Sequence, residues 1–474
     1  MSRSVVLVVL DSVRADRCGV YGHERATTPT LSGLDTIRFQ SAYANAPYTP
    51  ASMPSFLTSR YPLEQGHVVF NDYPTIPDYL SETDYMTAIA YNNAQITAWR
   101  YDEPFDTVRD FSTFDSSDAV DPGEDPGPVA SVLGSLRSKV YTRLQRSKRL
   151  AAYAKDTYLR FGSEPNPNPP DQVVLSEAKR LSTELPEPYF LYVHLMDTHH
   201  PYVFEPEDFE AVSPFDYDEH RYRRLLSRAA THVDVGEFVW SLSAEQRDYL
   251  RAAYDASIRA VDRQLASFIE NCDEETTVIV TSDHGEEFWE RGHFGHGARP
   301  SKPREMTLHE EMVRVPLLVH GPDGVDTDIT TSVSLVDLLP TILDIAGIER
   351  ESDSIRGQSL LDHLEGEPES RDIVMHATSP GDPNGFYEDP EACYLAAIRS
   401  GDNKLHFHEN EPPRVYDLSS DPDEHNDIEA ANEQRVSTLK ERLLDTIERN
   451  DVDTSDHRLD TDVESTLQEL GYLE

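Results

Sequence analysis

The sequence predicts an α/β fold with a mostly parallel central sheet and a smaller C-terminal α+β subdomain. Two observations support this prediction. Short runs that are apolar at every position alternate with longer helical stretches through most of the chain, and strands buried on both faces of a parallel sheet have this composition. After about residue 370 the pattern changes to short strand-like pieces followed by one amphipathic helix.

Five apolar runs are expected to form central strands. They are Val5–Leu10, Met86–Tyr91, Tyr189–Leu195, Thr277–Thr281 and Pro316–His320. The clearest helical period between them runs from about Glu245 to Ile269. Ser243 and Gln246 have the spacing of a capping box, which predicts the start of that helix.

We divide the chain into a larger α/β domain over residues 1–370 and a C-terminal α+β subdomain with its tail over residues 371–474. Two segments of the larger domain look inserted. Residues 114–175 begin with a loop rich in Ser, Asp, Pro and Gly, and residues 205–240 are polar and aromatic without a clear period.

The composition excludes several classes of protein. The 474 residues carry 42 basic and 87 acidic side chains, a net charge of −45. This charge argues against a nucleic-acid partner, because phosphate contacts need clustered Lys and Arg. No run of 18 apolar residues occurs, so no membrane-spanning helix is predicted.

The location is expected to be cytoplasmic. The first apolar run is too short for the core of a signal peptide. The three cysteines, Cys18, Cys272 and Cys393, are widely separated and have no metal-binding spacing, which predicts a reducing compartment.

The acid excess also suggests a salt-adapted protein from an extreme halophile. Acidic residues are spread over the whole chain, and only seven of the basic residues are Lys. Their mutual repulsion destabilises a compact state unless concentrated salt screens it. The alternative is an ordinary acidic protein.

Polar side chains gather where the predicted strands end, which is where sites form in open α/β sheets. Those that carry the argument are Asp11, Ser12, Asn92, Asn93, His199, Asp283 and His284. Carboxylates favour Mg, Ca or Mn, and an imidazole shifts the preference toward Mn or Zn. Singly, Asp11 would be a helix N-cap and Asp283 part of a polar turn; together they predict a site for one divalent metal ion.

The segment from Tyr48 to Arg60 is predicted to be a loop that runs into a helix, and it contains several Thr and Ser hydroxyls. Helix N-termini favour bound anions, and a metal ion can lower the pKa of a nearby hydroxyl. A hydroxyl at this helix N-terminus is therefore well placed for phosphoryl or sulfuryl chemistry; the alternative is that Thr, Ser and Pro merely start the helix.

These motifs, taken in order, resemble the sulfatase-like branch of the alkaline phosphatase superfamily. The resemblance covers nearly the whole chain and rests on Val-Leu-Asp-Ser-Val-Arg, Ser-Phe-Leu-Thr-Ser-Arg-Tyr-Pro, Leu-Met-Asp-Thr-His-His-Pro-Tyr, Thr-Ser-Asp-His-Gly-Glu and Val-Tyr-Asp-Leu. It implies an alkaline-phosphatase-like sandwich and one divalent metal ion; the candidates are Mn, Zn, Mg and Ca.

The resemblance assigns roles by position. Its implied metal ligands are Asp11, Ser12, Thr49, Asp283 and His284, with Ser12 standing where many members have a second Asp. Thr49 would also be the nucleophile, and His199 would assist departure of the leaving group. His296 is implied as a further substrate or metal histidine. We expect Asn92 and Asn93 to contact the substrate; the alternative is that they cap a turn.

The nucleophile position departs from the family pattern. Classical sulfatases have Cys or Ser in a Cys/Ser-x-Pro-x-Arg motif, which is oxidised to formylglycine. Thr49 occupies that position and Met53 the position of the Arg. Threonine is not a substrate for this oxidation, so no formylglycine is expected. The sulfate-gripping Lys-Trp-His segment is also replaced, near Tyr91–Ala94.

The predicted activity follows from this departure. Formylglycine hydrate releases sulfate by collapsing to an aldehyde, which threonine cannot do. We therefore predict a hydrolase or transferase that cleaves phosphate esters, including phosphodiesters, through a covalent Thr49 intermediate. The alternatives are a sulfuric ester hydrolase without formylglycine and a non-catalytic binding protein on the same fold.

Residues 137–160 form a basic amphipathic stretch with eight basic residues and one acid. We hypothesise that it docks on anionic lipid headgroups or an acidic glycan, which predicts peripheral membrane contact and a lipid- or glycan-linked ester substrate. The alternative is an internal partner for the acidic surface.

Other polar residues near the predicted site receive a structural interpretation. We expect His194 to be a satisfied core histidine within its strand, and His200 and His293 to be ordinary surface residues. Glu286 and Glu287 are expected to be solvated in so acidic a chain.

Overall fold

Eight strands form the central sheet of the chain in a computed structural model, in the order β12-β2-β11-β7-β1-β6-β4-β5. They are β1 (Val5–Leu10), β2 (Ile37–Phe39), β4 (Met86–Tyr91), β5 (Thr107–Asp110), β6 (Tyr189–Leu195), β7 (Thr277–Ser282), β11 (Leu317–His320) and β12 (Thr327–Ile329). The adjacent strands from β7 to β5 all pair in parallel. The predicted mostly parallel sheet is confirmed.

The structure describes residues 3–62, 64, 73–112, 169–235, 242–296, 307–321, 323–349, 355–366, 371–378, 394–408, 411–428 and 433–446. The basic stretch at residues 137–160 lies outside these residues, so its contact with a membrane or glycan stays a prediction. Cys393 also lies outside them.

One predicted central strand runs in the opposite direction from its neighbours. β11 pairs antiparallel with both β7 and β2. The chain between β7 and β11 contains the short strands β8 (Glu287–Phe288) and β9 (Phe294–Gly295) and the helix α11 (Glu310–Val313). A parallel connection is usually a long crossover helix, and no such helix occurs among the described residues there. Apolar composition predicted the strand but could not show its direction.

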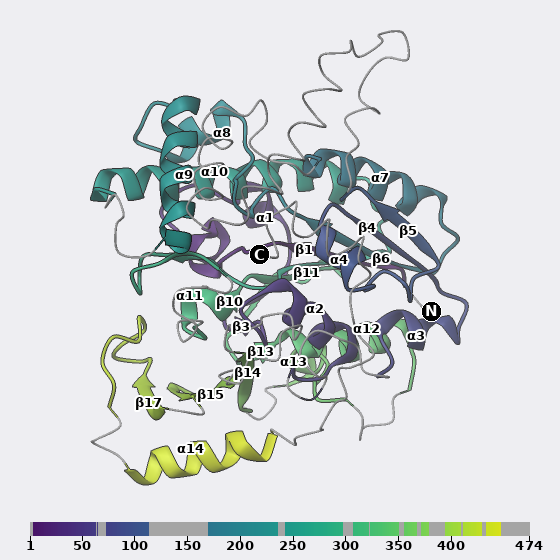
Figure 1. Cartoon of the computed structure of the whole chain (residues 1–474). Coiled ribbons are helices and arrows are strands. Elements are labelled where there is room, and N and C mark those ends of the chain that lie inside the picture. The colour runs from purple at the N-terminus through teal and green to yellow at the C-terminus, as the bar shows by residue number, and fades with distance from the viewer. Residues whose placement is uncertain are drawn as a thin grey trace, which may run out of the picture.

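Helices cover both faces of this sheet (Figure 1). One layer contains α1 (Pro29–Gly33), α7 (Asp171–Glu184), α8 (Pro206–Val212), α9 (Glu219–Val235) and α10 (Ala244–Ile269). The other contains α2 (Thr49–Thr58), α3 (Ile76–Ser81), α4 (Ala94–Ala98) and α12 (Leu338–Ala346). Alternate residues of β1 face the two layers, with Val6 and Val8 in one apolar cluster and Val5 and Leu7 in the other.

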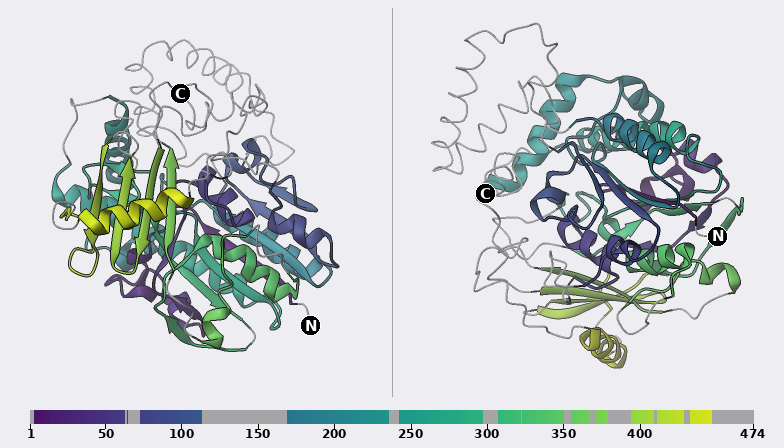
Figure 2. Two further views of the ribbon diagram at one scale, coloured as in Figure 1. Left: turned by 90° about the horizontal axis from the view of Figure 1, so that it is seen from below. Right: turned by 90° about the vertical axis from the view of Figure 1, so that its right-hand side faces the viewer.

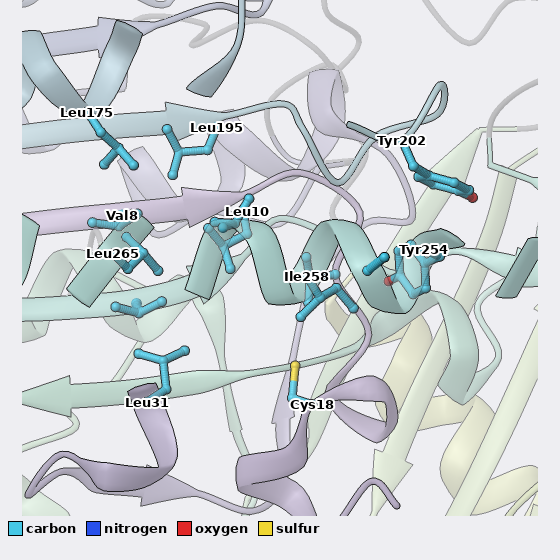
Figure 3. Packing of buried hydrophobic residues seen from close by; sticks show 14 of the residues in the cluster. Val8, Leu10, Cys18, Leu31, Leu175, Leu195, Tyr202, Tyr254, Ile258 and Leu265 are labelled. Atoms are coloured by element: carbon cyan, nitrogen blue, oxygen red, sulfur yellow. The ribbon is translucent and has the colours of Figure 1, made fainter. Parts of the chain in front are cut away.

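The helix α10 is the main partner of the first face. Its start has the predicted capping box, in which Ser243 Oγ accepts from Gln246 N at 3.3 Å and Gln246 Oε1 accepts from Ser243 N at 3.0 Å. Ile258 and Leu265 pack in the cluster that also contains Val8 (Figure 3). Full burial of such a side chain stabilises the fold by roughly 1.5–3 kcal/mol. No helix of the described residues is long and apolar enough to cross a membrane.

The segments that looked inserted include well-packed helices. Val174 and Leu175 of α7 lie in the apolar core. In α9, Tyr222, Leu225 and Leu226 are buried in the same cluster, and their spacing is that of one helical face. The interpretation that residues 205–240 lack a clear period is therefore wrong. The division into domains at residue 370 stays a prediction.

A four-stranded antiparallel sheet follows in the C-terminal part of the chain. Its strands are β14 (Ile373–Thr378), β15 (Tyr394–Ser400), β16 (Asn403–His408) and β17 (Glu411–Asp417). The helix α14 (Glu433–Thr446) buries Val436, Leu439 and Leu443 against this sheet. Figure 2 shows α14 on the face turned away from the central sheet, which agrees with the predicted sheet and amphipathic helix.

The C-terminal sheet supports the segment that leads into α2. Met375 of β14 and Ala397 of β15 share an apolar cluster with Tyr48 and Ala51. His376 N also donates to Asn45 O at 2.8 Å. Between the two large sheets lies a small one made of β3 (Ala42–Tyr43), β10 (Arg314–Val315) and β13 (Val333–Ser334). The residues on either side of Thr49 are therefore packed against the C-terminal sheet.

Candidate active site

The carboxyl ends of β1, β6 and β7 lie at one edge of the central sheet, because these strands are adjacent and parallel. Asp11 directly follows β1, and Asp283 with His284 directly follows β7. The N-terminus of α2 brings Thr49 to the same place, where its Oγ1 lies 3.2 Å from Asp11 Oδ2 and 3.3 Å from His284 Nε2. Asp11, Thr49, Asp283 and His284 thus meet in one buried cluster, although they lie far apart in the sequence.

Asp11 is at the centre of this cluster and is fully buried. Its Oδ2 lies 3.2 Å from Thr49 Oγ1, 3.2 Å from Asn93 Nδ2 and 3.2 Å from His194 Nε2. Its Oδ1 accepts from Ser12 Oγ at 2.5 Å. Burial opposes ionisation of Asp11, but the neighbouring imidazoles, His194 foremost, outweigh it and hold the pKa of Asp11 well below its usual range.

Asp283 is the second buried carboxylate. Its Oδ1 accepts from Ser12 N at 3.2 Å and from His284 N at 3.0 Å, whereas its Oδ2 is buried without a hydrogen-bond partner. Within the described ranges, neither Asp11 nor Asp283 forms an ion pair with Lys or Arg. Buried charges are costly unless they are paired or coordinate a metal.

The donor set fits a divalent cation. One ligand atom each from Asp11, His194 and Asp283 lies within 4.8 Å of the others, and the same holds for Asp11, His284 and His296. Carboxylates combined with imidazole suit Mn or Zn best, and carboxylates alone suit Mg or Ca. The orphan Oδ2 of Asp283 gives such an ion an open carboxylate oxygen.

Ser12 has a strained backbone, with φ of 63° in the left-handed region. A non-glycine residue pays roughly 1 kcal/mol for this conformation. Two contacts hold it: Tyr254 Oη donates to Ser12 O at 2.7 Å, and Ser12 N donates to Asp283 Oδ1. The strained turn aims the Ser12 hydroxyl at Asp11 Oδ1 rather than at the Oδ2 of Asp283.

A group of histidines lies beside the two carboxylates. The ring centroid of His296 is 4.4 Å from that of His284 and 4.9 Å from that of His199. The His200 ring stacks on His199 with centroids 4.7 Å apart. His199 and His296, the two histidines predicted beyond the metal ligands, are thus in contact at the site.

Glu286 sets the charge of this group. It is fully buried, with Oε1 3.0 Å from His296 Nδ1 and Oε2 3.6 Å from His200 Nδ1. Burial lowers the pKa of His296, but Glu286 outweighs it and raises that pKa to about 9. Burial lowers the pKa of His199 to about 3, against the opposing effect of Asp11. His296 therefore keeps its proton at neutral pH, whereas His199 is neutral.

The structure corrects several structural interpretations. Glu286 and Glu287 are buried rather than solvated, and Glu287 Oε1 accepts from the backbone of Arg291 and His293. His194 is buried with a partner for each ring nitrogen, as expected of a core histidine, and in addition its Nε2 faces Asp11 while its Nδ1 bonds Tyr192 Oη at 2.9 Å. Its place near the carboxyl end of an apolar strand is the sequence signal that could have assigned His194 to the site.

Asn92 and Asn93 follow β4 but face different ways. Asn92 Nδ2 donates to Pro169 O at 2.8 Å and to Asp171 Oδ1 at 2.9 Å, which directs it toward the start of α7. Asn93 Oδ1 caps α4 by accepting from Gln95 N at 2.9 Å, and its Nδ2 faces Asp11. The structure thus brings Asn93 into the site and places the Asn92 amide nitrogen in a structural contact.

Comparison with known proteins agrees with this geometry. The family model described as Sulfatase matches residues 3–348, and one described as N-sulphoglucosamine sulphohydrolase, C-terminal, matches residues 304–450. The uncharacterized sulfatase YidJ of Escherichia coli (strain K12) is 24% identical over 460 residues, which cover 94% of this chain and 87% of the relative.

Two solved structures show the same fold. The phosphonate monoester hydrolase of Agrobacterium radiobacter aligns with a TM-score of 0.60 at 20% identity, over 94% of this chain and 95% of that one. BT4656 in complex with its substrate D-glucosamine-2-N,6-O-disulfate aligns with a TM-score of 0.65 at 18% identity, over 97% of this chain and 100% of that one. Because the Sulfatase family model matches most of its length, this chain belongs to the sulfatase family and is a sulfatase-like ester hydrolase with an alkaline-phosphatase-like fold.

Proposed function

We propose that this enzyme cleaves phosphate esters, including phosphodiesters, through a covalent intermediate on Thr49. The observation that carries the proposal is the hydroxyl of Thr49, whose Oγ1 lies 3.2 Å from Asp11 Oδ2 at the position of the residue that classical sulfatases oxidise. Threonine cannot become formylglycine, so an ester on Thr49 must be released by attack of water or an alcohol. The fold also occurs in a phosphonate monoester hydrolase, which acts on phosphorus esters.

The residues that would hold a divalent metal ion are Asp11, Thr49, Asp283 and His284. The ion would lower the pKa of the Thr49 hydroxyl and offset charge on the ester oxygens. Ser12 would act beside it, since its hydroxyl orients Asp11 Oδ1 at 2.5 Å. His194 would orient the other oxygen of Asp11.

In the first half of the reaction, Thr49 Oγ1 attacks phosphorus while the bond to the leaving oxygen breaks. The Thr49 hydroxyl, which donates to Asp11 Oδ2 in the structure, releases its proton to solvent, because the ion would lower the pKa of this hydroxyl. The protonated His296 pairs with an anionic ester oxygen. His199 delivers a proton to the leaving oxygen, because the bound anion favours the charged form of this imidazole.

In the second half, water or an alcohol attacks the phosphorus of phospho-Thr49. His199, left neutral by the first half, takes the proton of the attacking hydroxyl. The bond between Thr49 Oγ1 and phosphorus breaks, and the Thr49 hydroxyl regains its proton. The α2 N-terminus lies beside the phosphoryl group in both halves, where its dipole favours negative charge.

Family membership supports a second candidate, a sulfuric ester hydrolase that forms a Thr49 sulfate ester. A choline-sulfatase of Rhizobium meliloti is 24% identical over 441 residues. This candidate differs from the first only in the central atom that Thr49 attacks, so the same experiment separates them.

The test compares substrates in the presence of Mn, Zn, Mg or Ca in concentrated KCl. An aryl sulfate, a phosphate monoester, a phosphodiester and a phosphonate ester are assayed with the wild type and with Thr49→Ala. We expect phosphodiester or phosphonate turnover that falls about 10³-fold or more in Thr49→Ala. Thr58→Ala, at the other end of α2, is the matched control, because the Thr58 hydroxyl donates to Pro54 O of its own helix.

Two results would overturn the proposal. The first is threonine-dependent turnover of the aryl sulfate alone, which would select the sulfuric ester hydrolase. The second is equal phosphodiester turnover by Thr49→Ala and the wild type. Mass spectrometry of the peptide that contains residue 49 checks the absence of formylglycine independently of activity.

A further inference from the structure

A second cluster of metal-ligating side chains lies where the C-terminal sheet meets the larger domain. His309 immediately precedes α11, His406 belongs to β16, and Glu424 lies in the turn after β17. One ring nitrogen from each histidine and one carboxylate oxygen all lie within 4.8 Å of one another. The two ring centroids are 4.5 Å apart, and His406 Nε2 is 2.8 Å from Glu424 Oε1.

The hydrogen bonds of the cluster leave one nitrogen unexplained. His309 Nδ1 is buried and has no hydrogen-bond partner among the described residues. An unsatisfied buried polar atom of this kind costs about 1–3 kcal/mol.

The backbone of the third member is strained. Glu424 has φ of 52°, in the left-handed region, which costs a non-glycine residue roughly 1 kcal/mol. Its side chain is nevertheless fully buried. Residues held in such conformations cluster at ligand sites. The strain here directs a carboxylate at two histidines.

A closed ion-pair network is the simpler explanation, and it accounts for only part of the cluster. Lys404 Nζ lies 2.9 Å from Glu310 Oε1 and 3.2 Å from Glu424 Oε1, and Glu424 Oε2 accepts from Glu310 N at 2.7 Å. The network neutralises Glu424 but gives no partner to His309 Nδ1. The shorter of the two contacts of Lys404 is with Glu310. Its ammonium group therefore keeps its ion pair with Glu310 when Glu424 Oε1 binds a metal cation.

We propose that His309, His406 and Glu424 bind a divalent cation of the Zn²⁺ class, with solvent as a fourth ligand. Two imidazoles and one carboxylate are a ligand set that Zn²⁺ accepts in tetrahedral geometry. The site is distinct from the cluster around Asp11 and serves a structural purpose. It joins β16 and the turn after β17 to the segment that begins α11.

This link reaches the strand end that carries His284. Two residues beyond His309, Glu311 O accepts from Glu286 N at 3.2 Å, and Met312 O accepts from Gly285 N at 2.7 Å. A cation at His309 therefore fixes the backbone that runs beside residues 285 and 286. An ion that binds only the folded chain raises its stability by mass action.

The test uses Co²⁺ as a spectroscopic probe and removes the other site first. Metal-free Asp283→Asn protein, which lacks a proposed active-site ligand, is titrated with CoCl₂ and followed by visible absorption. We expect one Co²⁺ per chain with the intense bands of four-coordinate cobalt. Adding His406→Gln or His309→Gln should weaken this binding roughly 100-fold. His425→Gln, the exposed neighbour of Glu424, is the matched control and should bind as its parent does.

A second measurement guards against a folding defect of Asp283→Asn. In the otherwise wild-type chain loaded with Zn²⁺, the metal count should fall from two per chain to one in His406→Gln. Equal Co²⁺ affinity with and without His406, or an unchanged metal count, would overturn the proposal. Neither readout depends on turnover, so failure here and failure of the proposed phosphate-ester activity are separate results.

Discussion

The charge of one imidazole is controlled by one buried carboxylate at the active site. His296 keeps its proton at neutral pH because Glu286 Oε1 lies 3.0 Å from its Nδ1. Burial alone would favour the neutral ring, and Glu286 raises the pKa to about 9. In the proposed reaction this cation faces an anionic ester oxygen.

Glu286→Gln should therefore shift the pH dependence of the reaction. The wild type holds the His296 cation up to pH about 9. Without the carboxylate, burial lowers the His296 pKa, so the cation is lost at lower pH. We expect the alkaline limb of kcat/KM for a phosphodiester to move to lower pH, with a loss on the order of 10-fold at pH 8 and little loss at pH 6. The measurement is kcat/KM from pH 6 to 10.

The matched control is Glu287→Gln, the neighbouring buried carboxylate. Glu287 Oε1 accepts from the backbone N of Arg291 and of His293, whereas it is Glu286 that lies beside the His296 ring. The alkaline limb of kcat/KM in Glu287→Gln should lie at the same pH as in the wild type. An unshifted limb in Glu286→Gln would show that the His296 cation takes no part in the reaction.

Individual residues also show where sequence reasoning ends. Asp11, Thr49, Asp283 and His284 could be predicted because strand ends and helix starts are readable from local sequence. Glu286 could not, because its burial depends on His200 and His296, which come from other parts of the chain. The amide of Asn92 turns toward Asp171, a contact that local sequence does not encode.

At the scale of elements, α10 supports the strained turn that follows β1. Tyr254 Oη accepts from Arg14 N at 2.9 Å and donates to Ser12 O at 2.7 Å. These bonds are the contribution of α10 to the turn that carries Asp11. The helix therefore stabilises the fold and positions a proposed metal ligand.

Tyr254→Phe should lower stability and weaken metal binding together. The change leaves two buried backbone groups without their partner, which should cost about 1–3 kcal/mol in the free energy of unfolding. It also releases the turn beside Asp11, so the affinity of the active site for Mn²⁺ should fall several-fold. Urea unfolding and Mn²⁺ titration measure the two effects.

Tyr249→Phe is the same change on the same helix. Tyr249 Oη bonds the backbone N and O of Asp218, at the start of α9. This variant should lose stability while keeping wild-type affinity for Mn²⁺. Equal loss of affinity in both variants would mean that α10 acts through general stability and not through Ser12.

Elements were predicted best where pattern and local signals agree. The capping box and long period of α10 fixed both its start and its type. The direction of β11 was not predictable, because an apolar run is the same in either direction. The period of α9 was missed because aromatic and charged residues outnumber its few core positions, although Tyr222, Leu225 and Leu226 lie on one face.

The net charge of −45 is a property of the whole molecule. Away from the active site, the fold pairs some buried acids with cations: the carboxylate of Asp255 has Arg17 Nη2 and Arg25 Nη1 each at 2.7 Å. The remaining acids have too few cations to pair with. Self-repulsion then acts over the entire surface and falls with the Debye length.

We expect stability to rise steeply with KCl in the range where screening changes most. The Debye length falls from about 10 Å at 0.1 M to about 3 Å at 1 M. The thermal unfolding midpoint should therefore rise by roughly 10 °C or more between 0.05 and 1 M KCl. The alternative mechanism is exclusion of the salt from the protein surface, which favours burial of apolar groups. Sucrose acts in the same way but adds no ionic strength. Scanning calorimetry in KCl and in sucrose at equal osmolality separates the two, since only screening requires ions. A midpoint that is flat up to 1 M KCl would mark an ordinary acidic protein, whereas a steep rise in KCl with little change in sucrose would assign the charge to life in concentrated salt.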